Sequence, residues 1–415
     1  MLSFSECRGW KAPATDGFGL AFFVPPHNMR AMKRPAQKPL KKIIAAHFLS
    51  GAVSEFTLDG GRVVGRRSVR AKTDVVLGPG LLDLQCNGYA GIDFNHPDTT
   101  VEQMAAAIRA MWRDGCAHVL PTLITASPDR LSLLFSRLVT ALKSDPDVAA
   151  SVPGFHLEGP FISPQDGARG AHPLAHVCAV DRKLWREWQR AADGRIRLVT
   201  VAPEVGGAIP FIRQLRAEKI LPALAHTMAD ATTISRACDA GALMSTHLGN
   251  GCPQLMHRHK NPVLAQLAED RLAASIIPDG AHLPPEIVRL WHRVKGAERI
   301  VLVTDAMSAA SAPSGRYTIG DLVIEIGRDR IARQPGSPNL AGAAITMREA
   351  VERYVTMSGV PLAEAWLAAS ERAWNLLRLA GAVKRVPDST VFARWQGGKF
   401  DVLATLHGKR VLWAK

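Results

Sequence analysis

The 415-residue sequence lacks several features, and each absence argues against a class of protein. No apolar run approaches the roughly 18 residues that a membrane-spanning helix needs. The apolar stretch from Ala21 to Val24 is too short for a secretion signal. The six cysteines include no C-x-x-C pair, which in a chain of this length indicates reduced thiols rather than a disulfide framework. We therefore expect a cytoplasmic protein that does not bind membranes.

Motifs for nucleotide and nucleic-acid binding are also missing. Gly88-Tyr-Ala-Gly91 follows the first expected strand of the main domain without matching the dinucleotide-binding fingerprint. The net charge is +14, but residues 1–42 hold eight basic residues against Glu6 and Asp16, which accounts for +6 of it. We expect residues 1–40 to be a basic, flexible extension and expect no nucleic-acid partner. The remaining excess of about +8 favours an anionic substrate.

The pattern that is present from Val75 onward is an alternation of short β-rich runs with amphipathic helical stretches. Eight such runs occur: Leu81–Cys86, His118–Ile124, Val152–Leu157, Arg195–Val201, Ile220–Ala225, Leu243–Thr246, Leu272–Ile277 and Arg299–Thr304. The helical stretches between them include Val101–Arg113, Arg130–Leu142, Arg182–Ala192, Ile209–Lys219, Ala229–Ala240 and Pro285–Val294. Eight repeats of this length predict an α/β fold of the (β/α)8 TIM-barrel type.

Short strand patterns at both ends of the chain predict a second, smaller unit. Ile43–Phe48, Glu55–Leu58 and Arg62–Val64 lie before the barrel, and Thr390–Trp395, Asp401–Leu406 and Arg410–Trp413 lie after it. The Gly78-Pro79-Gly80 junction is typical of a domain boundary. We expect a small β-rich domain from residues 41–78 and 380–415, and a barrel from residues 79–379.

Acidic and imidazole side chains follow several of the expected strands, where the active sites of such barrels form. Glu158, His226, His247, His282 and Asp305 come at or just after the ends of the third, fifth, sixth, seventh and eighth runs. Two imidazoles and a carboxylate suit one borderline divalent metal, and a further carboxylate can act as a base beside it. Zn²⁺ suits this set best, and Fe²⁺, Co²⁺ and Mn²⁺ are also compatible.

The first run ends in amides rather than imidazoles. Gln85 and Asn87 stand where a metal-dependent hydrolase barrel can carry His-x-His. An amide does not donate a lone pair as an imidazole does, so these residues argue against a second tightly bound metal. They can equally cap backbone groups at the strand end.

These motifs together resemble the N-acetylglucosamine-6-phosphate deacetylase family of the amidohydrolase superfamily. The matching segments run in order from about residue 43 to the C-terminus: Pro79-Gly-Leu-Leu-Asp-Leu-Gln-Cys-Asn-Gly88, Leu120-Pro-Thr-Leu-Ile-Thr125, His156-Leu-Glu-Gly-Pro-Phe161, Val201-Ala-Pro-Glu204, His226, Thr246-His-Leu-x-Asn250, Asp279-Gly-x-His282, Thr304-Asp-Ala306 and Leu340-Ala-Gly-x-x-x-Thr-Met347. Residues 1–40 lie outside the resemblance.

The resemblance implies a role for each matching residue. Glu158, His226 and His247 would bind one metal, Gln85 would contact a water on that metal, and Asp305 would be the catalytic acid and base. His282 would contact the substrate near the scissile amide and serve in catalysis. The remaining substrate-binding residues would be Ala171, His172, Asn250, Gly251, Arg258, Leu340, Ala341 and Gly342. Asn250, Gly251 and Arg258 would lie at the phosphate, with Arg258 reaching it from the neighbouring subunit of a homodimer. The resemblance thus implies hydrolysis of an N-acetyl amino sugar phosphate.

The sixth-strand segment departs from the family pattern and keeps alternatives open. His247-Leu-Gly-Asn-Gly-Cys252 has glycines where many members have Tyr before the Asn and Ala-Met after it. The alternatives are a deacetylase for N-acetylgalactosamine-6-phosphate or an unphosphorylated sugar, another amidohydrolase, and a catalytically silent barrel used for binding. The missing His-x-His disfavours the second, and the complete set of ligands with Asp305 disfavours the third.

Overall fold

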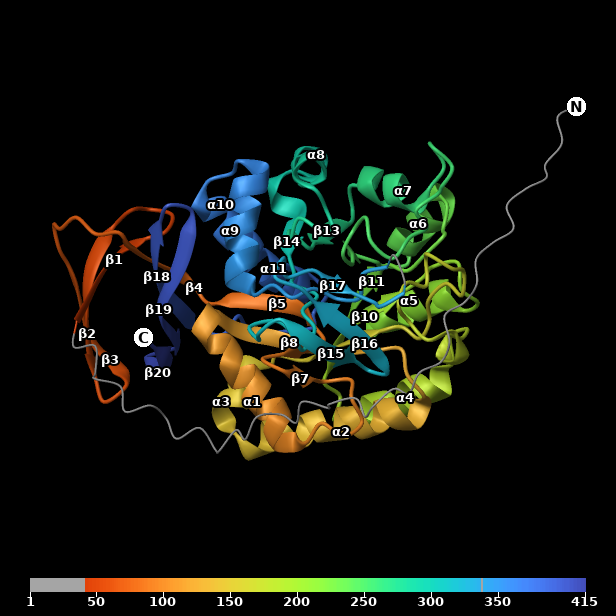
Figure 1. Cartoon of the computed structure of the whole chain (residues 1–415), viewed down its shortest axis with the longest axis horizontal. Helices are drawn as coiled ribbons and strands as arrows, with labels where there is room; N and C mark the ends of the chain where they lie inside the picture. The colour runs from red at the N-terminus through yellow and green to blue at the C-terminus, as the bar shows by residue number, and fades with distance from the viewer. Residues whose placement is uncertain (1–41, 337–338) are drawn as a thin grey trace, which may run out of the picture. The chain divides into compact units, whose positions relative to one another are not determined.

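The structure is a computed structural model that describes residues 42–336 and 339–415 (Figure 1). The expected flexible extension, residues 1–40, lies outside the described residues. Within the part of the chain that is described, no helix combines the length and the apolar character needed to cross a bilayer.

The main unit is a parallel barrel of eight strands, as the sequence predicts. The strands are β5 (Leu81–Cys86), β8 (Cys116–Ile124), β9 (Phe155–Glu158), β10 (Ile196–Val201), β11 (Leu221–Leu224), β12 (Met244–Ser245), β13 (Ala273–Ile276) and β14 (Ile300–Leu302). Each pairs with the next one along the chain. The predicted (β/α)8 fold class is confirmed, although several strands, β12 above all, are shorter than their apolar runs.

A buried side chain joins the first and last strands of this barrel. The hydroxyl of Thr304 donates to Asp83 Oδ2 at 2.5 Å, and the amides of Thr304 and Gln85 donate to Asp83 Oδ1, each at 3.2 Å. A parallel bridge pairs Cys86 with Ala306 at the same seam. Burial raises the pKa of Asp83 to about 7, against the effect of these hydrogen bonds. The seam therefore holds Gln85 and the residue after Thr304 close together.

The helices form where the apolar residues recur with helical periodicity, and most of them begin at a side-chain N-cap. The six predicted helices are present as α1 (Val101–Met111), α2 (Pro128–Ser144), α4 (Arg182–Ala191), α5 (Ala208–Ala217), α6 (Ala231–Asp239) and α8 (Pro285–Lys295). Thr100 and Gln103 form a capping box at the start of α1, and Met104, Ile108 and Met111 bury one face of it. The structure adds α3 (Pro146–Ser151), α7 (Pro262–Ala268), α9 (Met347–Ser358), α10 (Leu362–Ala368) and α11 (Glu371–Leu379).

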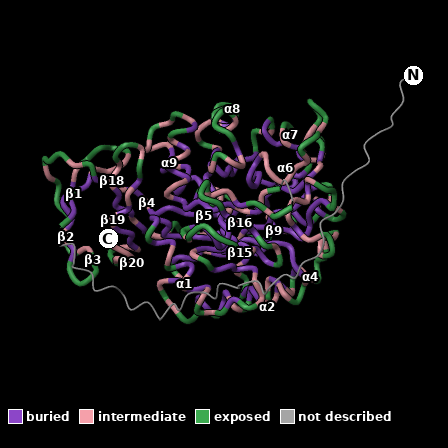
Figure 2. Tube along the Cα trace, in the orientation of Figure 1, coloured by how far each residue is buried: buried purple, intermediate pink, exposed green. Residues whose placement is uncertain are grey.

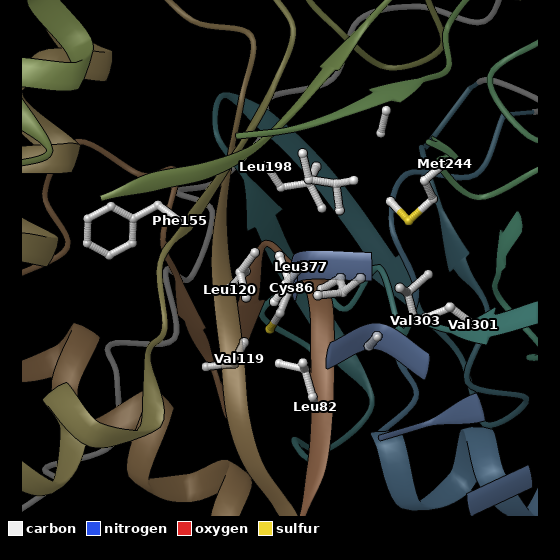
Figure 3. Close-up of a cluster of buried hydrophobic side chains, with 14 of the residues drawn as sticks. Leu82, Cys86, Val119, Leu120, Phe155, Leu198, Met244, Val301, Val303 and Leu377 are labelled. Atoms are coloured by element: carbon white, nitrogen blue, oxygen red, sulfur yellow. The ribbon is translucent and has the colours of Figure 1, made fainter. Parts of the chain in front are cut away.

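The core lies in and around the parallel strands. All nine residues of β8 are buried, because side chains on one face fill the barrel and those on the other face pack under the helices. The chain around β5 is likewise mostly buried (Figure 2). Leu82, Val119, Leu198 and Val301 belong to this cluster, which also includes Leu377 of α11 (Figure 3). This continuous apolar packing holds the strand ends in fixed positions.

Both ends of the described chain build a small closed β-barrel, which confirms the predicted β-rich domain. Its strands are β1 (Lys42–His47), β2 (Val53–Asp59), β3 (Arg62–Ser68), β4 (Val75–Pro79), β18 (Ser389–Gln396), β19 (Lys399–His407) and β20 (Arg410–Ala414), in the order β1-β2-β3-β20-β19-β18-β4. Phe56 and Phe392 meet edge to face inside it, with ring centroids 5.0 Å apart. The hydroxyl of Thr405 donates to the carbonyl of Trp112 at 2.7 Å, which links this barrel to the main one.

Two small antiparallel units in the loops after barrel strands were not predicted. One is the hairpin β6 (Gly88–Tyr89) with β7 (Ile92–Asp93), which follows β5. The other is a three-stranded sheet of β15 (Gly315–Ile319), β16 (Leu322–Ile326) and β17 (Ala332–Arg333), which follows β14. Because both follow the C-terminal ends of barrel strands, they belong to the face on which the candidate site lies.

Candidate metal centre and its cavity

Three of the sequence-predicted ligands come together at the C-terminal ends of the strands. Glu158 ends β9, and His226 and His247 follow β11 and β12 by two residues. The Nε2 atoms of His247 and His226 lie 2.9 Å and 3.4 Å from Glu158 Oε1. One ligand atom from each residue lies within 4.8 Å of the other two, and all three residues are buried. This nitrogen and oxygen set can hold a divalent metal ion.

The surroundings of His226 select the ring nitrogen that faces Glu158. His226 Nδ1 lies 2.9 Å from the carbonyl oxygen of Ala168, which can only accept a hydrogen bond. Nδ1 therefore carries the proton, and Nε2 is left with the lone pair that a metal requires. The ring also lies against Gly251, where a β-carbon would come within 2.7 Å of Nδ1. A glycine is thus needed there for the observed position of the ring.

Asp305 is linked to the cluster through the two amides of the first strand. Gln85 Nε2 donates to Glu158 Oε1 at 2.9 Å and to Asp305 Oδ1 at 3.1 Å. Asn87 Nδ2 donates to the same Asp305 oxygen at 2.6 Å. The amides at the first strand thus bridge the carboxylates, and they do not supply the imidazoles that a second metal would need.

Burial and charge separate the pKa values of the two carboxylates. Burial alone would raise the pKa of Glu158, but the neighbouring imidazoles of His226 and His247 hold it well below its usual range. Burial, followed by repulsion from the Glu158 charge, raises the pKa of Asp305 to about 6. One carboxylate therefore remains ionised while the other is poised to exchange a proton near neutral pH.

The backbone at the site is strained. His226, His247 and Asp305 have φ angles of 50°, 34° and 49°, in the left-handed region that residues with a β-carbon rarely adopt. Each lies just beyond a strand end, where the chain turns to bring its side chain toward the cluster. Such strain persists only where the surrounding structure fixes it, and it is typical of functional sites.

A cavity of about 530 Å³ opens onto the cluster, and most of the predicted substrate-binding residues line it. These lining residues are Ala171, His172, Asn250, Gly251, His282, Leu340, Ala341 and Gly342. Arg258 is exposed and does not line the cavity. The structure thus brings together every predicted substrate-binding residue except Arg258.

Two of the lining histidines are held by neighbours to which the sequence motifs assigned no role. His172 Nδ1 lies 2.8 Å from the hydroxyl of Thr125, and His282 Nδ1 lies 2.7 Å from Asp279 Oδ2. Asp279 Oδ1 also accepts the amide of His282 at 2.7 Å. Asp279 stands three residues before His282, a spacing from which this contact could have been inferred. Burial lowers the pKa of His172 to about 3, so its ring is neutral.

Apolar residues of the cavity were also missed. Ile124, at the end of β8, and Ile319, at the end of β15, both line it. Nothing in the sequence indicated that Ile319 lies near the site, because the three-stranded sheet to which it belongs was not predicted.

A (β/α)8 barrel with this cluster at its strand ends defines a protein of the amidohydrolase class. No protein-family model matches the chain. The chain is 32% identical over 302 residues to N-acetylglucosamine-6-phosphate deacetylase of Bacillus subtilis, covering 72% of this chain and 74% of that protein. It is also 32% identical over 316 residues to N-acetylgalactosamine-6-phosphate deacetylase of Escherichia coli O157:H7, covering 76% and 82% of the two chains.

Among solved structures, a variant of N-acetyl-D-glucosamine-6-phosphate deacetylase from Mycobacterium smegmatis, in complex with N-acetyl-D-glucosamine-6-phosphate, superposes with a TM-score of 0.76. It is 27% identical, and the match covers 90% of this chain and 99% of that one. The chain belongs to the N-acetylglucosamine-6-phosphate deacetylase family.

Proposed function

We propose that this protein hydrolyses the N-acetyl group of N-acetylglucosamine-6-phosphate to glucosamine-6-phosphate and acetate. The observation that carries the proposal is the cluster of Glu158, His226 and His247 with Asp305 tied to it, at the floor of a cavity of about 530 Å³. One divalent ion, which we propose to be Zn²⁺, would polarise the amide carbonyl and lower the pKa of a bound water. Fe²⁺, Co²⁺ and Mn²⁺ accept the same ligands.

Asp305 is the residue that we assign to proton transfer. Both amide hydrogen bonds to it fall on Oδ1, so Oδ2 is the oxygen assigned to exchange the proton. Asp305 takes a proton from the attacking water and then gives it to the leaving nitrogen, which makes the amine a better leaving group. A pKa of about 6 suits both steps, because the carboxylate is charged at neutral pH yet remains basic.

His282 is assigned to the substrate carbonyl. Nδ1 of its ring donates to Asp279, whose carboxylate would stabilise the imidazolium form, and in that form Nε2–H would donate to the carbonyl oxygen as negative charge develops there. His172, Ala171 and the backbone of residues 340–342 would position the sugar ring within the same cavity.

The phosphate group calls for a cationic side chain. The described residues that line the cavity include no Lys or Arg. We propose that Asn250 and Gly251 contact the phosphate and that Arg258 of a second copy reaches it, which makes the enzyme a homodimer. Arg258→Ala should raise KM for the phosphorylated sugar while leaving hydrolysis of the unphosphorylated sugar unchanged. Light scattering during gel filtration would test the dimer.

N-acetylgalactosamine-6-phosphate is the second candidate substrate. The similarity to the Escherichia coli enzyme named for that sugar is at the same level of identity as the similarity to the Bacillus subtilis enzyme. Gly249 and Gly251, in the loop beside the cavity, both have positive φ, a conformation that the Tyr and Ala of the family pattern would rarely adopt.

Acetate release distinguishes these possibilities. Purified, metal-loaded enzyme is given N-acetylglucosamine-6-phosphate, N-acetylgalactosamine-6-phosphate and N-acetylglucosamine in parallel. We expect the highest kcat/KM for the first. A higher kcat/KM for N-acetylgalactosamine-6-phosphate would make that sugar the substrate of the proposed reaction. No acetate release from any of the three sugars with metal bound would refute the proposed activity. We place the reaction in the cytoplasm, which the five free cysteines of the described residues support.

A further inference from the structure

One side of the cavity next to the metal cluster is apolar. Ile124 pairs in register with Glu158 in the β8–β9 ladder, so the two side chains leave neighbouring strands toward the same side of the sheet. Ile319 lines the same cavity from β15, and the adjacent Gly320 lies against Ile124, since a β-carbon there would be 4.0 Å from Ile124 Cδ1. Ile124 and Ile319 are only 9% and 4% exposed. We call these two side chains the isoleucine wall.

A buried polar loop fixes the position of this wall. Asp93 Oδ2 accepts the amide of Gly320 at 2.8 Å and the hydroxyl of Thr318 at 3.1 Å, which anchors the turn that carries Ile319. Two residues later, Asn95 Oδ1 accepts the amide of Ile124 at 2.8 Å. Both isoleucines are therefore held by one short segment, whose Asp93 and Asn95 are themselves buried. These hydrogen bonds hold both isoleucines in place relative to Glu158, which lies beside Ile124.

The position of the wall decides which part of a substrate meets it. In the proposed reaction, the ion that Glu158, His226 and His247 would hold faces the carbonyl oxygen of the scissile amide, and Asp305 faces the amide nitrogen. The carbon chain of the acyl group is the remaining substituent of the carbonyl carbon, and it is the apolar one. Because Ile124 neighbours Glu158, an apolar surface is available beside the carbonyl for that chain.

We propose that the isoleucine wall determines the length of the acyl group that the enzyme removes, accepting acetyl and excluding longer chains. The proposal rests on the proposed amide hydrolysis and adds a selectivity that this reaction alone does not require. A difference of one methylene in a pocket of this kind changes kcat/KM by about 10- to 200-fold. We therefore expect the wild-type enzyme to prefer N-acetyl over N-butanoyl glucosamine-6-phosphate by at least about 10-fold.

The test compares N-acetyl, N-propanoyl and N-butanoyl glucosamine-6-phosphate as substrates of metal-loaded wild type, Ile319→Ala and Ile324→Ala. Ile324 is the matched control, because it is a fully buried isoleucine of the same apolar cluster that does not line the cavity. We expect Ile319→Ala to raise the ratio of butanoyl to acetyl kcat/KM by about 10-fold or more, and Ile324→Ala to leave it unchanged. If the alanine variant does not fold, Ile319→Val and Ile124→Val replace it in the test. These changes remove less volume, so we expect a smaller rise, seen in the ratio of propanoyl to acetyl kcat/KM.

The outcomes separate this inference from the activity on which it rests. The inference is wrong, and the activity stands, if the wild type releases acetate but the ratio of butanoyl to acetyl kcat/KM is the same in all variants. The same conclusion follows if the wild type removes butanoyl as fast as acetyl. An equal rise in the ratio for Ile324→Ala would show general loosening of the cluster and would also refute the wall. If the wild type releases no acetate with metal bound, the proposed function fails and the inference fails with it.

Discussion

Gly251→Ala should weaken metal binding through a direct collision with one of the proposed ligands. A β-carbon at Gly251 would lie 2.7 Å from His226 Nδ1 and 2.9 Å from Cε1, whereas ordinary contacts begin near 3.4 Å. The imidazole must therefore move by about 0.7 Å or the loop must withdraw. Since bonds from zinc to nitrogen are about 2.1 Å long and vary by only about 0.2 Å, such a shift is not tolerated at an unchanged metal position.

The size of the effect follows from the contacts that are lost. Moving the ring breaks the hydrogen bond from His226 Nδ1 to Ala168, and loss of such an orienting partner lowers metal affinity about 10- to 100-fold. The φ of +59° at Gly251 adds about 1–2 kcal/mol of backbone strain for alanine. Gly194→Ala is the control for that strain, because Gly194 has a φ of +67° with open space around its β-carbon position.

The assay is competition for Zn²⁺ between the protein and a chromophoric chelator, with unfolding in urea measured in parallel. Both variants should lose similar stability, and only Gly251→Ala should lose metal affinity and activity at limiting metal. If the folded Gly251→Ala protein bound Zn²⁺ with wild-type affinity, His226 would not be a metal ligand whose position depends on this loop.

Three further perturbations have defined outcomes. Asp305→Asn should lower kcat by about 10²- to 10⁴-fold with metal content unchanged, as measured by acetate release and elemental analysis; a near-normal rate would remove Asp305 from the mechanism. Burial raises the pKa of Asp93 from 3.8 to about 7, so the folded state binds the proton more tightly and the stability due to Asp93 falls as the pH rises from about 4 to 7. In urea unfolding, the stability of wild type relative to Asp93→Asn should therefore fall over this range by up to about 1.4 kcal/mol per pH unit, and a constant difference would contradict the shift. Thr304→Val leaves Asp83 Oδ2 without its hydroxyl donor and should lower the free energy of unfolding by about 1–3 kcal/mol, with Thr304→Ser restoring most of it.

The barrel was predictable because its signal repeats. Each parallel strand is largely buried on both faces and reads as a short apolar run. The longer helices between strands carry an apolar face, and α1, α2, α4 and α6 also carry a side-chain N-cap. The small domain was found from the same local patterns at the two chain ends. The sheet of β15, β16 and β17 was not found, because its strands are short and largely exposed on one side, and its order comes from contacts such as that of Gly320 with Asp93.

The site was predictable only as far as position along a strand determines it. Glu158, His226 and His247 were expected together because the ends of parallel strands meet at one face of a barrel. The double use of Asp305 Oδ1 by Gln85 and Asn87 was not foreseen, since it depends on side-chain conformations that no spacing specifies. The isoleucine wall was missed for a different reason: apolar residues near a site look like core in a sequence.

The small β-barrel also sets an order of events during synthesis. Its strands β1 to β4 leave the ribosome first, but β4 pairs with β18 and β3 with β20, and those strands are made only after the whole catalytic barrel. Until those strands are made, β3 and β4 lack these partners, and unpaired strand edges are sites of misassembly. The β4 strand leads directly into β5, and β18 follows the last helix, so closing the small barrel ties together the two ends of the catalytic unit.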